Sequence, residues 1–134
     1  MFATASTLLG RLLIASIFIA SALSKIGNHD KTVEHMTAAG MPLAGALIYV
    51  AVLVEVACGI LVATGFRARL GALLLALFLM PTTYYFHFRP AFDAAMNVVD
   101  QGQLLHVMKN LAIMGGLLMI YGNGAGKLTI GKDS

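Results

Sequence analysis

Four long apolar stretches constrain this sequence more than any other feature. They cover about residues 7–26, 43–64, 70–88 and 104–121. A helix needs about 20 apolar residues to cross a bilayer, and each stretch meets that requirement. Of all residues, 59% are hydrophobic and 11% are charged, whereas soluble domains average about 45–50% and about 25%. The sequence therefore predicts an all-α integral membrane protein, in which residues 1–134 form a single bundle of four transmembrane helices.

The two longer connections are predicted to contain short helices. Residues 27–42 and 89–102 are polar but carry apolar residues at helical spacing, such as Phe92, Met96 and Val99 in the second connection. Amphipathic segments of this kind lie at membrane interfaces. We therefore expect a short interfacial helix in each of the two outer loops.

The positive residues predict the orientation of the bundle. Four spans place both termini on one side, which then holds five Lys and Arg residues against four on the other. Cytoplasmic loops carry the excess of positive charge, so we expect both termini in the cytoplasm. The net charge of +3 comes mainly from residues that flank the spans, and we expect no nucleic-acid partner.

Each span carries an ionisable residue within it or at its end. Such a residue costs about 2.5–3.5 kcal/mol on insertion scales and usually faces the bundle interior or a wet cavity. The residues are Arg11, Lys25, Glu55, His87 and Lys109.

Glu55 carries the strongest site prediction, because it lies near the middle of the second span and is too short to reach water. It should be protonated or paired with a cation. Lys109 is the expected partner, and Lys25 is the next choice. The alternative for Arg11 and Lys25 is that they only extend toward the interfaces. His87 taken alone is better explained as marking the end of the third span.

Histidines supply a second set of candidates. His106, Lys109 and Asn110 share one face of the fourth helix, since they are three and four residues apart. His87 and His106 could serve as axial haem ligands, but no spacing motif supports this, and we expect neither haem nor a metal ion. Cys58 is the single cysteine, which excludes an internal dithiol–disulfide pair.

Several short motifs in order along the chain resemble the DoxX family. They are Gly10-Arg11-Leu12-Leu13, Ser21-Ala22-Leu23-Ser24-Lys25-Ile26, Gly40-Met41-Pro42, Glu55-Val56-Ala57-Cys58-Gly59, Thr64-Gly65-Phe66-Arg67, Phe86-His87 and Lys109-Asn110-Leu111-Ala112-Ile113-Met114-Gly115-Gly116. The resemblance implies a four-helix protein of a bacterial or archaeal inner membrane. Some relatives, of the DoxD type, are linked to a thiosulfate:quinone oxidoreductase complex. By position, the resemblance marks Arg11, Lys25, Glu55, His87, Lys109 and Asn110.

These observations favour a redox-associated membrane subunit that binds a quinone or a similar lipid-soluble ligand at a polar cluster within the bundle. It would act with a soluble or membrane-bound redox partner, because the sequence holds no cysteine pair and no nucleotide-binding loop; a homo-oligomer is also compatible. The predicted catalytic residues are Glu55, Lys109 and His87, and the predicted ligand-binding residues are Arg11, Lys25, Asn110 and His106. Two alternatives fit the same residues: a protein that binds or transports a small molecule or lipid, and a non-catalytic membrane adaptor.

Overall fold

Four long helices account for most of the chain. The computed structural model describes residues 2–131. The helices are α1 (Phe2–Gly27), α3 (Ala44–Thr64), α4 (Ala68–Thr83) and α6 (Gln101–Asn123). Each is long and apolar enough to cross a membrane when α4 is counted with its continuation to Ala91. The predicted fold class is therefore confirmed.

The outer faces of these helices are suited to lipid. Leu53 and Met119 expose 67% and 68% of their surface, and many other large apolar side chains are similarly exposed. Contiguous apolar surface on this scale is rare on monomeric soluble proteins. The hydrocarbon core of a bilayer accounts for it, and the chain is a membrane-spanning protein.

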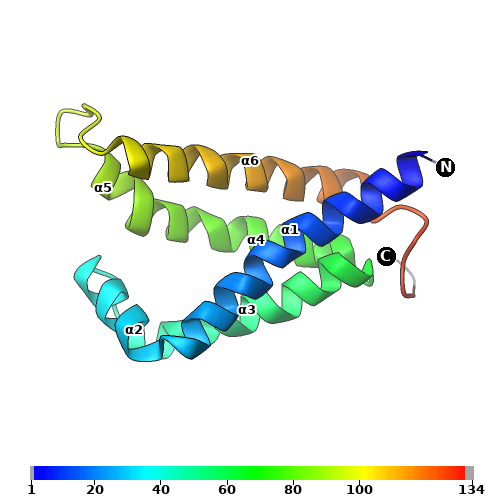
Figure 1. Cartoon of the computed structure of the whole chain (residues 1–134), viewed down its shortest axis with the longest axis horizontal. Coiled ribbons are helices and arrows are strands. Elements are labelled where there is room, and N and C mark those ends of the chain that lie inside the picture. Colours follow the sequence, from blue (N-terminus) through cyan, green and yellow to red (C-terminus); the bar gives the residue numbers. More distant parts are fainter. Residues whose placement is uncertain (1, 132–134) are drawn as a thin grey trace.

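The helices pack in the order α1, α3, α4, α6. Each packs extensively on the next, whereas α1 and α6 meet only weakly. Figure 1 shows α1 crossing close to α6 at the end that carries both termini and then running beside α3 toward the opposite end. The bundle is therefore closed at the termini end and more open at the end formed by the two longer connections, which we call the loop end.

Small residues allow the closest helix contacts. A Cβ atom on Gly59 would lie 2.9 Å from Ile19 Cδ1, and one on Gly116 would lie 2.8 Å from Ile14 Cδ1. Close approach through small residues is typical of helix pairs in membranes. These two glycines fix α3 against α1 and α6 against α1.

The first connection forms a helix as predicted. Helix α2 (His29–Ala38) buries Met36, which packs with Ile48 of α3 and with Phe86. Its apolar side thus rests on other helices of the bundle, where the sequence had suggested the bilayer surface.

The second connection differs from the prediction. Apart from the short α5 (Arg89–Ala91), which finishes the third span, residues 92–100 are not helical. The Asp93 carboxylate accepts hydrogen bonds from the backbone N–H groups of Ala95 and Asn97, at 2.9 and 2.8 Å. Aspartate commonly stabilises turns in this way. The turn competes successfully with a helix, so Phe92, Met96 and Val99 form no helical stripe.

The third span changes its geometry after Pro81. Helix α4 continues as a π-helical segment, η1 (Tyr84–Phe88), before α5. Proline has no N–H group to donate to the carbonyl four residues earlier, and the Thr82 hydroxyl donates to the following carbonyl, that of Phe78, at 2.9 Å. π-Helical turns are rare and often occur at functional sites. Here the segment carries His87 to the loop end.

Candidate functional site

An ion pair joins the first two spans at the loop end. Lys25 Nζ, in the last turns of α1, lies 2.9 Å from both carboxylate oxygens of Glu55 on α3. Its remaining hydrogen bond is to Ser21 Oγ, at 2.6 Å and one helical turn away. The Glu55 side chain is 3% exposed and the Lys25 side chain 19%. The pair is thus almost enclosed, with the lysine as its more accessible member.

Lys25, and not Lys109, is the partner of Glu55, so the first choice made from the sequence was wrong. The reason is helix order: α1 packs directly on α3, whereas α6 packs on α4. A carboxylate at this depth needs a cation nearby because an isolated buried charge is very costly. Removing either partner would leave the other uncompensated.

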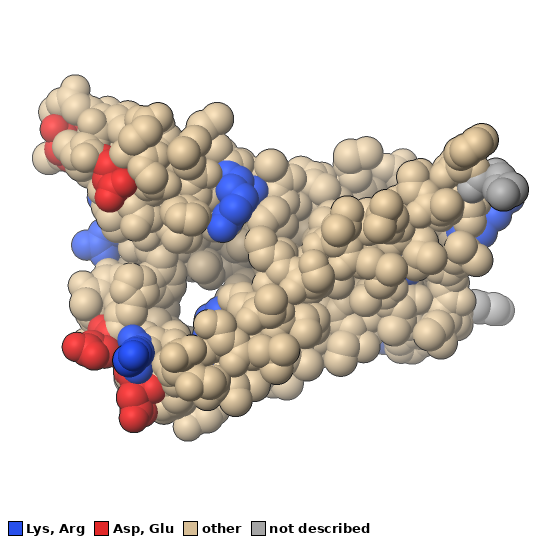
Figure 2. Space-filling view, in the orientation of Figure 1, with Lys and Arg blue, Asp and Glu red and all other residues tan. Residues whose placement is uncertain are grey.

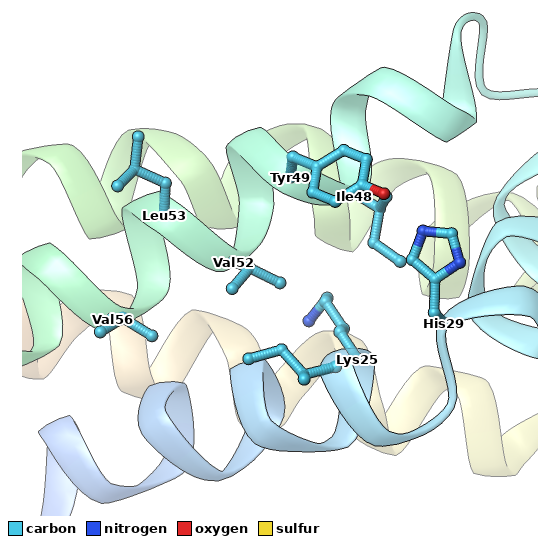
Figure 3. Close-up of a pocket in the computed structure, with 8 residues that line it drawn as sticks. Lys25, His29, Ile48, Tyr49, Val52, Leu53 and Val56 are labelled. Atoms are coloured by element: carbon cyan, nitrogen blue, oxygen red, sulfur yellow. The ribbon is translucent and has the colours of Figure 1, made fainter.

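A cavity of about 380 Å³ adjoins the pair where α1 and α3 diverge. Figure 3 shows the Lys25 side chain rising from α1 into the space between the two helices. The other lining residues are mostly apolar and are Ile26, His29, Ile48, Tyr49, Val52, Leu53 and Val56. An apolar cavity with a few polar groups is the usual form of a small-molecule site.

Two polar residues of this cavity were not singled out by the sequence as site residues. The rings of His29 and Tyr49 lie 5.6 Å apart between centroids, and His29 Nδ1 is 2.9 Å from Asp30 Oδ1. His29 stands at the start of α2 and Tyr49 in the first half of α3. The packing of α2 beside α3 brings the two rings together, so no local motif could have revealed them.

A second polar group lies between η1 and α6. The rings of His87 and His106 stack at 4.9 Å. His87 Nδ1 donates to Gln103 Oε1 at 2.7 Å, and Lys109 Nζ lies 3.3 Å from His106 Nδ1. Three predicted site residues therefore meet, together with Gln103, which the sequence gave no reason to select. Within residues 2–131, no hydrogen bond or ion pair joins this group to Lys25 or Glu55.

Asn110 has a separate place. Its side chain is buried and donates to Thr83 Oγ1, at 3.0 Å. This bond joins α6 to the end of α4. A buried amide that is satisfied by a neighbouring helix contributes to helix pairing, and Asn110 lies outside the apolar cavity.

Arg11 lies far from the other predicted site residues. It precedes Lys25 by 14 residues on one helix, which corresponds to about 21 Å at 1.5 Å per residue. Its guanidinium is buried and donates to the backbone carbonyls of Val62, at 3.4 Å, and Leu128. The arginine is held inside the bundle at the termini end and does not extend to an interface.

The site residues offer no metal-binding cluster among the described residues. Within residues 2–131, no three His, Cys, Asp or Glu side chains come close enough to hold a metal ion together. The polar groups at the loop end, which are the lysine–glutamate pair and the histidines, can donate and accept hydrogen bonds.

The fold and the buried polar groups define a small four-span membrane protein with an ion pair beside an apolar cavity. The DoxX family profile matches residues 6–88, so the chain belongs to the DoxX family. It is 31% identical to the inner membrane protein YqjF of Escherichia coli over 125 residues, covering 93% of this chain and 88% of that protein. It is 27% identical to the E. coli inner membrane protein YphA over 125 residues, covering 93% and 87%. No solved structure matches the chain.

Proposed function

We propose that this chain is a redox-associated subunit of a bacterial inner membrane that binds a quinone or a similar lipid-soluble carbonyl compound beside Lys25 and Glu55. The observation that carries the proposal is the ammonium group of Lys25 at the edge of an apolar cavity of about 380 Å³. A quinone has an apolar ring and tail and two carbonyl acceptors. The apolar walls suit the ring, and Lys25 supplies a charge-assisted donor for a carbonyl.

Binding must change the hydrogen bonds of Lys25. An ammonium group has three donors, and Ser21 and the two Glu55 oxygens already accept all of them. A ligand carbonyl would replace the Ser21 hydroxyl, which is the neutral acceptor of the three. Glu55 would then remain as the counter-charge, while the Lys25 ammonium would give a proton to the reduced ligand and take up another from water.

Electrons must come from another protein. Reduction of a quinone to a quinol takes up two electrons and two protons, and the sequence offers no cysteine pair and no nucleotide-binding loop. The chain would therefore bind the quinone and supply protons, while a redox partner supplies electrons.

The test is a titration of the purified full-length chain in detergent with a short-chain ubiquinone analogue, followed by calorimetry. Lys25→Met should weaken binding by about 10-fold or more, which corresponds to loss of one charge-assisted hydrogen bond. Lys31→Met is the matched control, since Lys31 is exposed on α2 and outside the cavity. Equal binding by both variants, or no binding to the wild type, would overturn the proposal.

Lys109→Ala separates the two polar groups of the loop end. Because Lys109 contacts His106 and does not line the cavity, this variant should bind the quinone as the wild type does. If Lys109→Ala loses binding and Lys25→Met does not, the quinone binds at the His87–His106 group.

The orientation belongs to the same proposal. Both described chain ends lie at one end of the bundle (Figure 1), and we propose that this end faces the cytoplasm. The apolar cavity would then open near the opposite surface. A reporter that is active only in the periplasm, fused to the C-terminus, should be inactive; its activity there would reverse the orientation.

A further inference from the structure

A second cavity lies at the loop end, away from Lys25 and Glu55. It has a volume of about 480 Å³ and lies between α2, the η1–α5 segment and the start of α6. Its polar lining residues are His35, Tyr85, Arg89 and Gln103. Figure 2 shows this end hollowed between two lobes, with basic side chains near the hollow and acidic ones on the outward surfaces of both lobes.

The polar lining consists of hydrogen-bond donors without carboxylates. Arg89 donates from Nη1 to the Ala39 carbonyl at 3.1 Å, and its guanidinium lies 5.7 Å from the Tyr85 ring centroid. Arginine has five N–H groups, and within residues 2–131 no other acceptor binds them. The guanidinium is thus fixed in position while most of its donors stay available.

The neighbouring side chains are also held in place. The His35 ring stacks on Phe86, with centroids 5.3 Å apart. Gln103 accepts from His87 through its carbonyl oxygen, which leaves its NH₂ group as a donor. Across the described chain, neither that NH₂ group nor the Tyr85 hydroxyl has a protein acceptor.

From this arrangement we infer that the cavity lined by His35, Tyr85, Arg89 and Gln103 binds a phosphate-type oxyanion. An oxyanion presents several acceptors and a negative charge, and it would satisfy a fixed guanidinium, an amide and a hydroxyl at once. No acidic residue lines the cavity to repel it. The π-helical turn of η1 has a role here, because it carries Tyr85 into the wall and Arg89 follows directly after it.

The oxyanion could be the headgroup of an anionic phospholipid or a free ion. Arg89 stands near the end of the third span, and basic pockets at that depth bind lipid headgroups. A free phosphate ion would make the same contacts from water. The site is independent of the quinone proposal, because it shares no residue with the Lys25 cavity.

Two measurements on the full-length chain, made without quinone, test the inference. Calorimetry with inorganic phosphate in a neutral detergent detects a free oxyanion. Native mass spectrometry from nanodiscs that mix phosphatidylglycerol with phosphatidylcholine detects a retained anionic lipid. Binding in the first measurement identifies a free-ion site, and selective retention of phosphatidylglycerol only in the second identifies a headgroup site. If neither ligand binds, the inference is wrong.

Substitutions of the lining residues test whether the ligand binds in this cavity. Arg89→Gln should weaken binding about 10- to 100-fold, as expected for loss of charge-assisted hydrogen bonds, and Tyr85→Phe about 3-fold. The matched control is Arg69→Gln, because Arg69 also donates to carbonyls at a helix end, those of Tyr121 and Gly122, but at the termini end. Tyr85→Phe retains the ring against Arg89 and so reports on the ligand even if Arg89→Gln displaces α2. Equal binding by Tyr85→Phe, Arg69→Gln and the wild type would overturn the inference.

Discussion

The termini end and the loop end each bury a basic residue of the same helix, but the two residues bind different kinds of partner. Arg11 donates to backbone carbonyls of Val62 and Leu128. Lys25 binds the side chains of Ser21 and Glu55 beside a cavity. Backbone carbonyls stay where the fold places them, whereas side-chain partners can exchange for a ligand.

The surroundings of the two residues reinforce this difference. At the termini end, the C-terminal tail returns over the turn after α3, and Ile130 N–H donates to the Thr64 carbonyl at 2.9 Å. At the loop end, α1 parts from α6 and cavities remain. The termini end therefore holds the helices together, and the loop end has space for a ligand.

Gly65→Ala should give the largest loss of stability. Gly65 has φ of +80°, and a Cβ atom there would collide with the Arg11 guanidinium and with Thr129. Left-handed backbone and overpacking together should cost about 4 kcal/mol, measured as the free energy of unfolding in detergent. Gly122→Ala is the control, because its Cβ would meet nothing within 4 Å. Equal stability of the two variants would show that the termini end is not tightly packed.

Lys25→Met, at the loop end, should give the second largest loss of stability. It leaves the Glu55 carboxylate buried without its cation, which should cost about 3 kcal/mol of unfolding free energy. Chemical unfolding in detergent measures this loss, and Lys31→Met is the control because Lys31 is exposed on α2. Equal stability of the two variants would contradict the expected cost of the unpaired carboxylate.

Arg69→Ala should have a small effect at the termini end. Arg69 Nη1 lies 3.1 Å from the carbonyls of Tyr121 and Gly122, at the C-terminal end of α6. A cation there satisfies terminal carbonyls and interacts with the helix dipole, which is worth about 0.5–1 kcal/mol. Thermal unfolding in detergent measures this loss of stability. A loss as large as that of Gly65→Ala would contradict this ranking.

The smallest expected effect is a pH dependence in the stability of the turn at Asp93, in the second connection. Hydrogen bonds from the backbone N–H and the side-chain amide of Asn97 lower the pKa of Asp93 below its ordinary value of 3.8. A carboxyl group with a lowered folded pKa stabilises the fold above its unfolded pKa, and this contribution disappears as the pH falls through the folded pKa. Amide hydrogen exchange at Ala95 and Asn97 should therefore accelerate, relative to Asp93→Asn, only below about pH 4. Exchange that parallels the variant at every pH would contradict the assignment.

The four spans were predictable because apolar stretches of membrane-spanning length admit few other structures. The pairing of Glu55 was only half predictable. Its depth required a cation, but periodicity describes the face of one helix and not which helices are neighbours. The packing of α1 on α3 selects Lys25 over Lys109.

The remaining differences have the same origin in long-range contacts. Arg11 was grouped with the site because its cost of burial is high, yet its partners are backbone carbonyls, one of which belongs to the returning tail, 117 residues away. The cavity residues Tyr49 and Gln103 carry no local signal, since a tyrosine or a glutamine near a span end is ordinary. Their roles appear only when separate helices are brought together.

The central claim is that the Lys25–Glu55 pair serves ligand binding more than folding. The most direct measurement combines Lys25→Met with Glu55→Leu and compares unfolding and quinone binding with the wild type. Replacing both members of a buried ion pair by apolar residues is often neutral for stability. We predict that the double variant folds with stability within about 1 kcal/mol of the wild type but binds the quinone analogue at least about 10-fold more weakly. A double variant that binds as the wild type does, or that fails to fold, would contradict the account.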